Sequence, residues 1–366
     1  MGKAKNTILL VIYTCILGGI VGAIIWTFLR VMNIGINFIW NYIPDKFSIP
    51  FYTIIVCTIG ALLIGLWRKK YDDYPEELRI VLGKVKKTGG YQYNNVLLIL
   101  FSALFPLILG ASVGPEAGLA GVIAGLCTWI GDKLKKYIHT VEELNVIGIS
   151  ATLGTIFKSP MFGFVAPLED EKKVTIPKNI KVILYLIAAL ASYASYMLLG
   201  KLFWSGSGIY SYSFEKLKLI DVAYIIPLAL IGIVGGLLYV VSHKLASWIS
   251  NKFKKYTVLK AVIGGIILGV VGTILPLTMF SGEHQMEEIG KKGAEIGIVM
   301  LIVVAVVKIV LTTICIESGL KGGHFFPIIF SGICLGYAFG MLFNVNEIFA
   351  MAVVTTALVG YTLKKP

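Results

Sequence analysis

Residues 110–118 read Gly-Ala-Ser-Val-Gly-Pro-Glu-Ala-Gly, and residues 318–327 read Ser-Gly-Leu-Lys-Gly-Gly-His-Phe-Phe-Pro. In both stretches, which we name break 1 and break 2, glycines precede a proline that introduces an apolar run. Proline is favoured in the first turn of a helix, because the N–H group that it lacks would have no partner there. Each break therefore predicts a helix that begins inside apolar sequence.

The sequence around the breaks is too apolar for a water-soluble enzyme. Its 366 residues are 57% hydrophobic and 14% charged, whereas soluble domains are about 25% charged, and the mean hydropathy is +0.84. The net charge of +13 comes from basic residues in short connections between apolar runs, which is typical of the cytoplasmic loops of membrane proteins and not of nucleic-acid binding. Because the sequence shows no nucleophile–base pair, phosphate-binding loop or metal-ligand spacing, we expect neither an enzyme nor a metal or cofactor site.

The apolar runs predict an all-α, multi-pass protein of the cell membrane. The first run, residues 7–31, follows a short basic start, and we expect a retained helix with a cytoplasmic N-terminus. Several later runs are shorter than the about 20 residues that cross a bilayer, or contain glycine and proline, as in transport proteins with broken, re-entrant helices. The later runs cover residues 51–67, 96–109, 115–131, 146–168, 181–200, 220–242, 259–280, 296–316, 327–343 and 348–363.

An internal repeat is predicted by three patterns that recur in the same order. Gly-Ile-Val-Gly occurs at residues 19–22 and 232–235, a glycine-rich stretch ends at Pro115 and at Pro327, and A-x-x-G-x-x-x-K-x-P starts at Ala151 and at Ala357. The displacements are 213, 212 and 206 residues. We therefore expect a first membrane repeat in residues 1–205 and a second, inverted one in residues 206–366. The second is incomplete at its C-terminal end, so the sequence is either a piece of a longer chain or lacks the last helices.

The paired breaks predict an anion site. A helix that begins in the membrane directs its first N–H groups and the positive end of its dipole into the gap before it. Two such starts in matching repeat positions can hold an anion without a full positive charge, firmly enough to bind it and weakly enough to release it. The alternative is that glycine and proline only allow close packing or kinks.

At these residues the chain resembles a divergent, bacterial-type member of the CLC family of chloride channels and proton/chloride exchangers. The family signature G-[K/R]-E-G-P aligns with residues 111–115 and G-x-F-x-P with residues 323–327, and residues 157–163 resemble the F-N-A-P-L-A-G run. The resemblance implies a homodimer in the lipid bilayer, inverted halves, and a pore in each subunit for chloride or a similar small anion. It places the anion-binding positions at Ser112, Val113, Gly114, Gly323, His324, Phe325 and Phe326.

The departures from the family pattern bear on mechanism. The gating glutamate of the family falls on Val113, which can neither compete with the anion nor carry a proton. By resemblance, the pore lacks this gate and strict proton coupling. Glu116, one turn further along, either substitutes for the missing carboxylate or only interacts with the dipole of its own helix.

Two further carboxylates have open interpretations. The family signature G-S-G-I-P matches only at Pro75 and sets Asp72 where an anion-coordinating serine belongs. There Asp72 would be protonated, point away or weaken the site; otherwise the charged stretch around it is a solvated cytoplasmic loop. Asp170 aligns with the glutamate that delivers protons from the inner side in exchangers, or belongs to an interfacial charge cluster.

Three functions follow. The first is passive, channel-type chloride conduction without strict proton coupling. The second is proton/chloride exchange that uses Glu116 and Asp170 as substitute carboxylates. The third is a non-transporting, CLC-derived membrane subunit, which the missing gate and the early chain end suggest.

Overall fold

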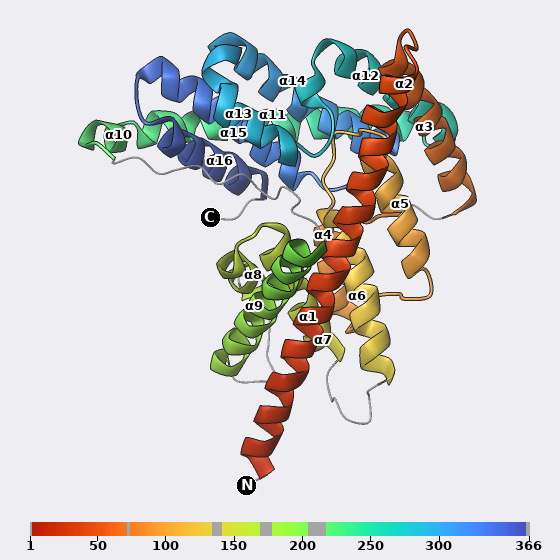
Figure 1. Ribbon diagram of the computed structural model, residues 1–366, viewed down its shortest axis with the longest axis vertical. Helices are drawn as coiled ribbons and strands as arrows, with labels where there is room; N and C mark the ends of the chain where they lie inside the picture. Colours follow the sequence, from red (N-terminus) through yellow and green to blue (C-terminus); the bar gives the residue numbers. More distant parts are fainter. Residues whose placement is uncertain (1, 72–73, 134–140, 169–177, 204–216, 364–366) are drawn as a thin grey trace. The chain divides into compact units, whose positions relative to one another are not determined.

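The computed structural model describes residues 2–71, 74–133, 141–168, 178–203 and 217–363. Within these ranges the regular structure is helical, apart from one isolated backbone bridge (Figure 1). Seven helical segments of the described residues are long and apolar enough to cross a membrane, and three further apolar helices are shorter: Val96–Ile108, Leu144–Ile156 and Glu347–Leu363. The predicted all-α, multi-pass fold with short, broken helices is thereby confirmed.

One compact unit consists of Met1–Gly35, Pro75–Ala103 and Glu116–Gly206. In it α7 contacts four neighbouring helices, and α1 packs against α9 at Gly22, where an added Cβ would overlap the Ser192 carbonyl oxygen. Gly22 is thus needed for the close approach of two backbones. The helices of this unit are α1 (Gly2–Asn37), α4 (Leu78–Thr88), α6 (Glu116–Lys133), α7 (Val141–Ile156), α8 (Pro160–Leu168) and α9 (Lys178–Phe203).

The second compact unit consists of Ile36–Tyr74, Leu104–Pro115 and Ser207–Pro366. Here α3 packs on α12, α14 on α11 and α15, and α16 on α11 and α15. Gly232 of α11 repeats the role of Gly22, since an added Cβ would overlap the Val354 carbonyl oxygen. The elements are the π-helix η1 (Phe38–Tyr42), α2 (Ile43–Lys46), α3 (Tyr52–Lys70), α10 (Leu219–Ala223), α11 (Ile225–Lys252), α12 (Thr257–Ile274), the 3-10 turn η2 (Pro276–Thr278), α13 (Glu283–Ile296), α14 (Ile298–Ser318), α15 (Phe325–Phe343) and α16 (Glu347–Leu363).

The order of the helices repeats along the chain. One series consists of α1, α3, α4, α5 (Val96–Ile108), α6 and α7, and the second consists of α11, α12, α13, α14, α15 and α16. The third helix of each series, α4 or α13, is the one that is not an apolar run. Both α6 and α15 begin directly at a break, as the glycine–proline pattern predicts. Each compact unit is built from three separate segments of the chain. These units are therefore not the two repeats, and the expected repeat boundary between residues 205 and 206 stays a prediction.

Two helices, α4 and α13, were not predicted, because neither forms an apolar run. In α13 the buried positions Met286, Ile289 and Gly293 follow helical spacing, and polar residues separate them. The single run predicted at residues 146–168 is also two helices, α7 and α8. Lys158 lies between them with a left-handed φ of 49°, which a continuous helix does not allow.

Asp221 predicts a pH-dependent contribution to stability. Its carboxylate accepts hydrogen bonds from the backbone N–H groups of Asn346 (3.0 Å) and Lys218 (2.7 Å), which hold the Asp221 pKa below its ordinary value. A lowered folded-state pKa means that the stabilisation is complete above the ordinary pKa of about 4 and is lost as pH falls through the folded-state pKa. Asp221→Ala should therefore lower the unfolding temperature in detergent at neutral pH, by an amount that shrinks in acid.

The matched control is Glu288→Ala, which removes an exposed carboxylate of α13 and should leave the unfolding temperature unchanged. An Asp221→Ala deficit that is the same at neutral and acidic pH would contradict the assignment.

Candidate functional site: the junction of two broken helices

The two breaks meet through a main-chain bridge. The Gly114 N–H donates to the Gly323 carbonyl oxygen and the Gly323 N–H to the Gly114 carbonyl oxygen, each over 2.7 Å, in antiparallel geometry. Residues 110–115 and break 2 belong to the same compact unit. The structure thus brings together the starts of two chain segments that the sequence relates only by repetition.

Val113 closes the junction on its apolar side. Its side chain is fully buried, and a Cβ added to Gly322 would lie 2.5 Å from Val113 Cγ2. The Val113 N–H donates to the Ala111 carbonyl oxygen over 2.8 Å. Three of the predicted anion-binding positions, Val113, Gly114 and Gly323, therefore have their amides engaged in main-chain hydrogen bonds in this structure.

Ser112 ties break 1 to α14. Its Oγ lies 3.1 Å from Thr312 Oγ1, which is 2.8 Å from the Lys308 carbonyl oxygen. A hydroxyl has one hydrogen to donate. Because Thr312 gives its hydrogen to the carbonyl, Ser112 is the donor in the Ser112–Thr312 bond. The Ser112 hydroxyl thus also has a protein partner in this state.

The start of α15 carries the other predicted positions. His324 is the residue before the first turn, and its carbonyl oxygen accepts the Ile328 N–H over 3.1 Å. The imidazole ring stacks between the rings of Tyr239 on α11, with a centroid distance of 5.4 Å, and Phe325, at 5.2 Å. Phe325 and Phe326 are both buried. The aromatic stack joins the start of α15 to α11.

Of the three predicted carboxylates, Glu116 is the one that lies within the described residues. Glu116 is the first residue of α6 and is almost completely buried. Asp72 and Asp170 lie outside the residues that the structure describes, so the interpretations offered for them stay predictions.

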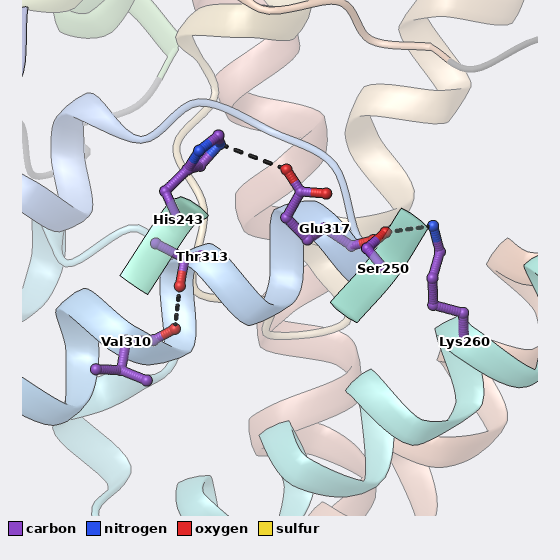
Figure 2. A network of polar contacts seen from close by, with 6 residues as sticks. All are labelled: His243, Ser250, Lys260, Val310, Thr313 and Glu317. Carbon is purple, nitrogen blue, oxygen red and sulfur yellow. Dashed lines mark hydrogen bonds and ion pairs between the residues drawn. The ribbon is translucent and has the colours of Figure 1, made fainter. Parts of the chain in front are cut away.

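A polar network anchors the end of α14 just before break 2. Figure 2 shows Glu317 of α14 beside α11: its carboxylate lies 3.5 Å from His243 Nε2, and its carbonyl oxygen accepts the Ser250 hydroxyl over 2.9 Å, with both partners on α11. Ser250 also accepts a hydrogen bond of 2.7 Å from Lys260 Nζ on α12. On the neighbouring turn of α14 Thr313 bonds the Val310 carbonyl oxygen. The network thus connects α11 and α12 to Glu317, the residue directly before break 2.

Lys308 is the functional candidate that sequence reasoning missed. It lies in the middle of α14, has no exposed surface, and directs its ammonium at a row of backbone carbonyls. A charged residue within a membrane helix is costly and is usually functional. The signal was present in the sequence, because Lys308 interrupts the apolar run at residues 296–316.

The fold and this junction define a class of protein: a multi-pass membrane transport protein in which two glycine-rich breaks in apolar sequence meet through a main-chain bridge. Helices that stop inside the membrane are tolerated where protein covers their ends or where they line a pathway.

The family follows from the comparison with known proteins. The model of the family described as voltage gated chloride channel matches residues 57–366. The chain therefore belongs to the voltage-gated chloride channel, or CLC, family, and CLC-type anion transport is its activity class. Relatives include YfeO of Salmonella newport (strain SL254) and of Salmonella agona (strain SL483), which carry a provisional name as ion-transport proteins. Each is 25% identical over 375 residues, covering 99% of this chain and 87% of YfeO.

Solved structures share the fold. A slow cyanobacterial Cl⁻/H⁺ antiporter superposes with a TM-score of 0.80 at 18% identity, over 97% of this chain and 85% of the antiporter. A CLC-type fluoride/proton antiporter gives 0.78 at 18% identity, over 98% and 87%. A eukaryotic CLC transporter gives 0.75 at 13% identity, over 96% and 64%.

The contact between Val113 and Gly322 gives a prediction for stability. Gly322→Ala inserts a methyl group against Val113, and overpacking of this kind costs about 1–3 kcal/mol. Adding Val113→Ala should recover part of the loss, because Cγ2 is removed while the Val113 Cβ, 2.7 Å from the new methyl, stays. Thermal unfolding of the single and double variants in detergent measures both effects.

Gly200→Ala is the matched control. Gly200 lies in α9 and nothing is within 4 Å of its added Cβ, so this variant should not be destabilised. Equal losses for Gly200→Ala and Gly322→Ala, or additive effects of the two changes at the junction, would refute the contact.

Proposed function

We propose that the chain conducts chloride or a similar small anion passively, without strict proton coupling. The observation that carries this proposal is Val113, which occupies the contact between the breaks. In CLC members that carry the family signature, the position of Val113 holds a glutamate, and its carboxylate competes with the anion. An isopropyl group can exclude an ion from the junction, but it cannot take up or release a proton.

Conduction requires the junction to open. When the anion and water replace the carbonyl and amide partners, each N–H···O bond of the bridge is exchanged and not lost, at a net cost of about 1 kcal/mol, or about 2 kcal/mol for the pair. Moving Val113 from Gly322 adds an apolar term of similar size. A state a few kcal/mol above the ground state is populated at roughly 0.1–10%, so thermal opening is sufficient for transport. The released amides of Gly114 and Gly323 then face the anion.

Orientation and assembly are part of the proposal. The last turn of α3 contains Arg68, Lys69 and Lys70, and that of α11 contains Lys252. Basic helix ends of this kind favour the cytoplasmic side, and we place the N-terminus there as well. By family resemblance the chain forms a homodimer, which cross-linking in native membranes tests.

A second candidate function is proton/chloride exchange through Glu116 and Asp170. It is favoured by the burial of Glu116 at the start of α6 and by structural neighbours that are antiporters. The third candidate, a non-transporting subunit, corresponds to a protein without saturable anion binding.

The leading proposal predicts chloride efflux from liposomes that contain the protein, with little response to a pH gradient. Val113→Ala removes about 1.5 kcal/mol of the apolar contact that holds the closed state, so efflux should rise about tenfold. Val354→Ala, a buried valine of α16, is the control and should leave the rate unchanged. Uphill proton movement driven by a chloride gradient would refute passive conduction.

Exchange predicts a different outcome for Glu116→Gln. If Glu116 carries protons, the variant loses chloride-driven proton uptake while chloride flux persists, because the amide keeps the shape of the side chain but cannot titrate. On the leading proposal, the wild-type protein and the variant show the same absence of proton uptake. Proton uptake that survives the substitution excludes Glu116 as the carrier.

A further inference from the structure

Lys308 is surrounded by hydrogen-bond acceptors. Its Nζ lies 2.9 Å from the Met279 carbonyl oxygen, 3.1 Å from that of Phe280, 3.2 Å from that of Thr278 and 3.4 Å from that of Leu277. It also lies 4.8 Å from the centre of the Phe330 ring. Carbonyl oxygens and a ring face accept from an ammonium and offer no hydrogen to a neutral amine. These contacts therefore stabilise an ammonium at this position, against the cost of burying it.

The charge of Lys308 has no ion-pair partner among the described residues. Carbonyl dipoles offset part of the cost of removing the ammonium from water, but they leave its unit charge in place. A buried cation that no carboxylate neutralises is stabilised by any anion that approaches it. The interaction is mutual, so the same charge stabilises the anion.

The carbonyl oxygens of residues 277–280, which we name the carbonyl row, and Lys308 are both linked to break 1 by hydrogen bonds. The Phe280 N–H donates to the Gly110 carbonyl oxygen over 3.1 Å, and Thr312, one helical turn beyond Lys308, holds Ser112. Two short connections thus join the ammonium to the residues that flank the junction. Four residues of α14 separate Lys308 from Thr312, about 6 Å along the helix axis, and the Thr312–Ser112 contact adds 3.1 Å, so the charge lies roughly 10 Å from the Ser112 side of the junction.

We infer that Lys308 is the fixed positive charge that stabilises the anion at the junction of the breaks, without touching it. The inference rests on the proposed function and adds an electrostatic determinant to that site. The competing role is structural, in which Lys308 only clamps residues 277–280. In the first role, anion affinity falls when the charge of Lys308 is removed, even if the protein stays folded. In the second, anion affinity falls only when the fold is disturbed.

Lys308→Gln removes the charge and keeps a donor, whereas Lys308→Arg keeps both. At about 10 Å and an effective dielectric of about 20, one unit charge changes anion affinity about tenfold. Isothermal titration of the detergent-solubilised full chain with chloride should thus give about tenfold weaker binding for Lys308→Gln and near wild-type binding for Lys308→Arg. Lys291→Gln removes one charge from an exposed side chain of α13. This control should bind chloride with wild-type affinity.

A second pair of variants leaves the clamp intact. Cys334 is buried on α15 and lies within electrostatic range of Lys308. Cys334→Asp neutralises the ammonium in place, and Cys334→Asn has the same shape without charge. Weaker chloride binding for the aspartate variant alone supports the inference, also where Lys308→Gln does not fold. Equal binding by both Cys334 variants, or wild-type affinity for folded Lys308→Gln, overturns it and leaves the proposed function standing. A wild-type protein without saturable chloride binding overturns both.

Discussion

The reciprocal hydrogen bonds between Gly114 and Gly323 satisfy a constraint that the membrane imposes on any broken helix. A helix that begins within the bilayer leaves its first N–H groups without helical partners, and an unsatisfied main-chain group there costs several kcal/mol. The bridge satisfies the backbone directly before each helix, because Gly114 and Gly323 each supply one donor and one acceptor to the other. The junction is consequently a place where main-chain bonds can exchange one acceptor for another.

Helix α14 holds the junction in position from both sides. Thr312 meets break 1 through Ser112, Lys308 gathers the carbonyls that lead to Gly110, and Glu317 is fixed by His243 and Ser250 directly before break 2. These contacts lie on one rigid helix, so their spacing is set by the helical repeat and not by loop conformation. A movement of α14 would displace both breaks together, whereas a movement of Val113 alone opens the junction locally.

Local patterns in the sequence were sufficient to predict the class of fold and the two helix starts. Glycine followed by proline acts through backbone geometry at the position itself, so Pro115 and Pro327 reported the starts of α6 and α15 correctly. The partner of a main-chain group is a tertiary property, and the sequence did not show that Gly114 would bond Gly323. The amphipathic α4 and α13 were missed because their apolar residues are spaced and not consecutive. Lys308 was visible as one charge in an apolar run, but only its four carbonyl partners distinguish an ordered cation from one that reaches the lipid headgroups.

On the proposed function, Val113 and Lys308 divide between them two tasks that a single carboxylate gate combines. A carboxylate at the junction blocks the path and repels the anion, and protonation relieves both effects at once, which links anion movement to protons. Valine blocks the path only by its size and by excluding water. When the Val113 side chain moves away from Gly322, no charge changes. Attraction then has to come from elsewhere, and Lys308 supplies it from behind the carbonyl row at a fixed distance. Since an isopropyl group has no proton to exchange, a gate made of Val113 retains selectivity for an anion while its link to protons is lost.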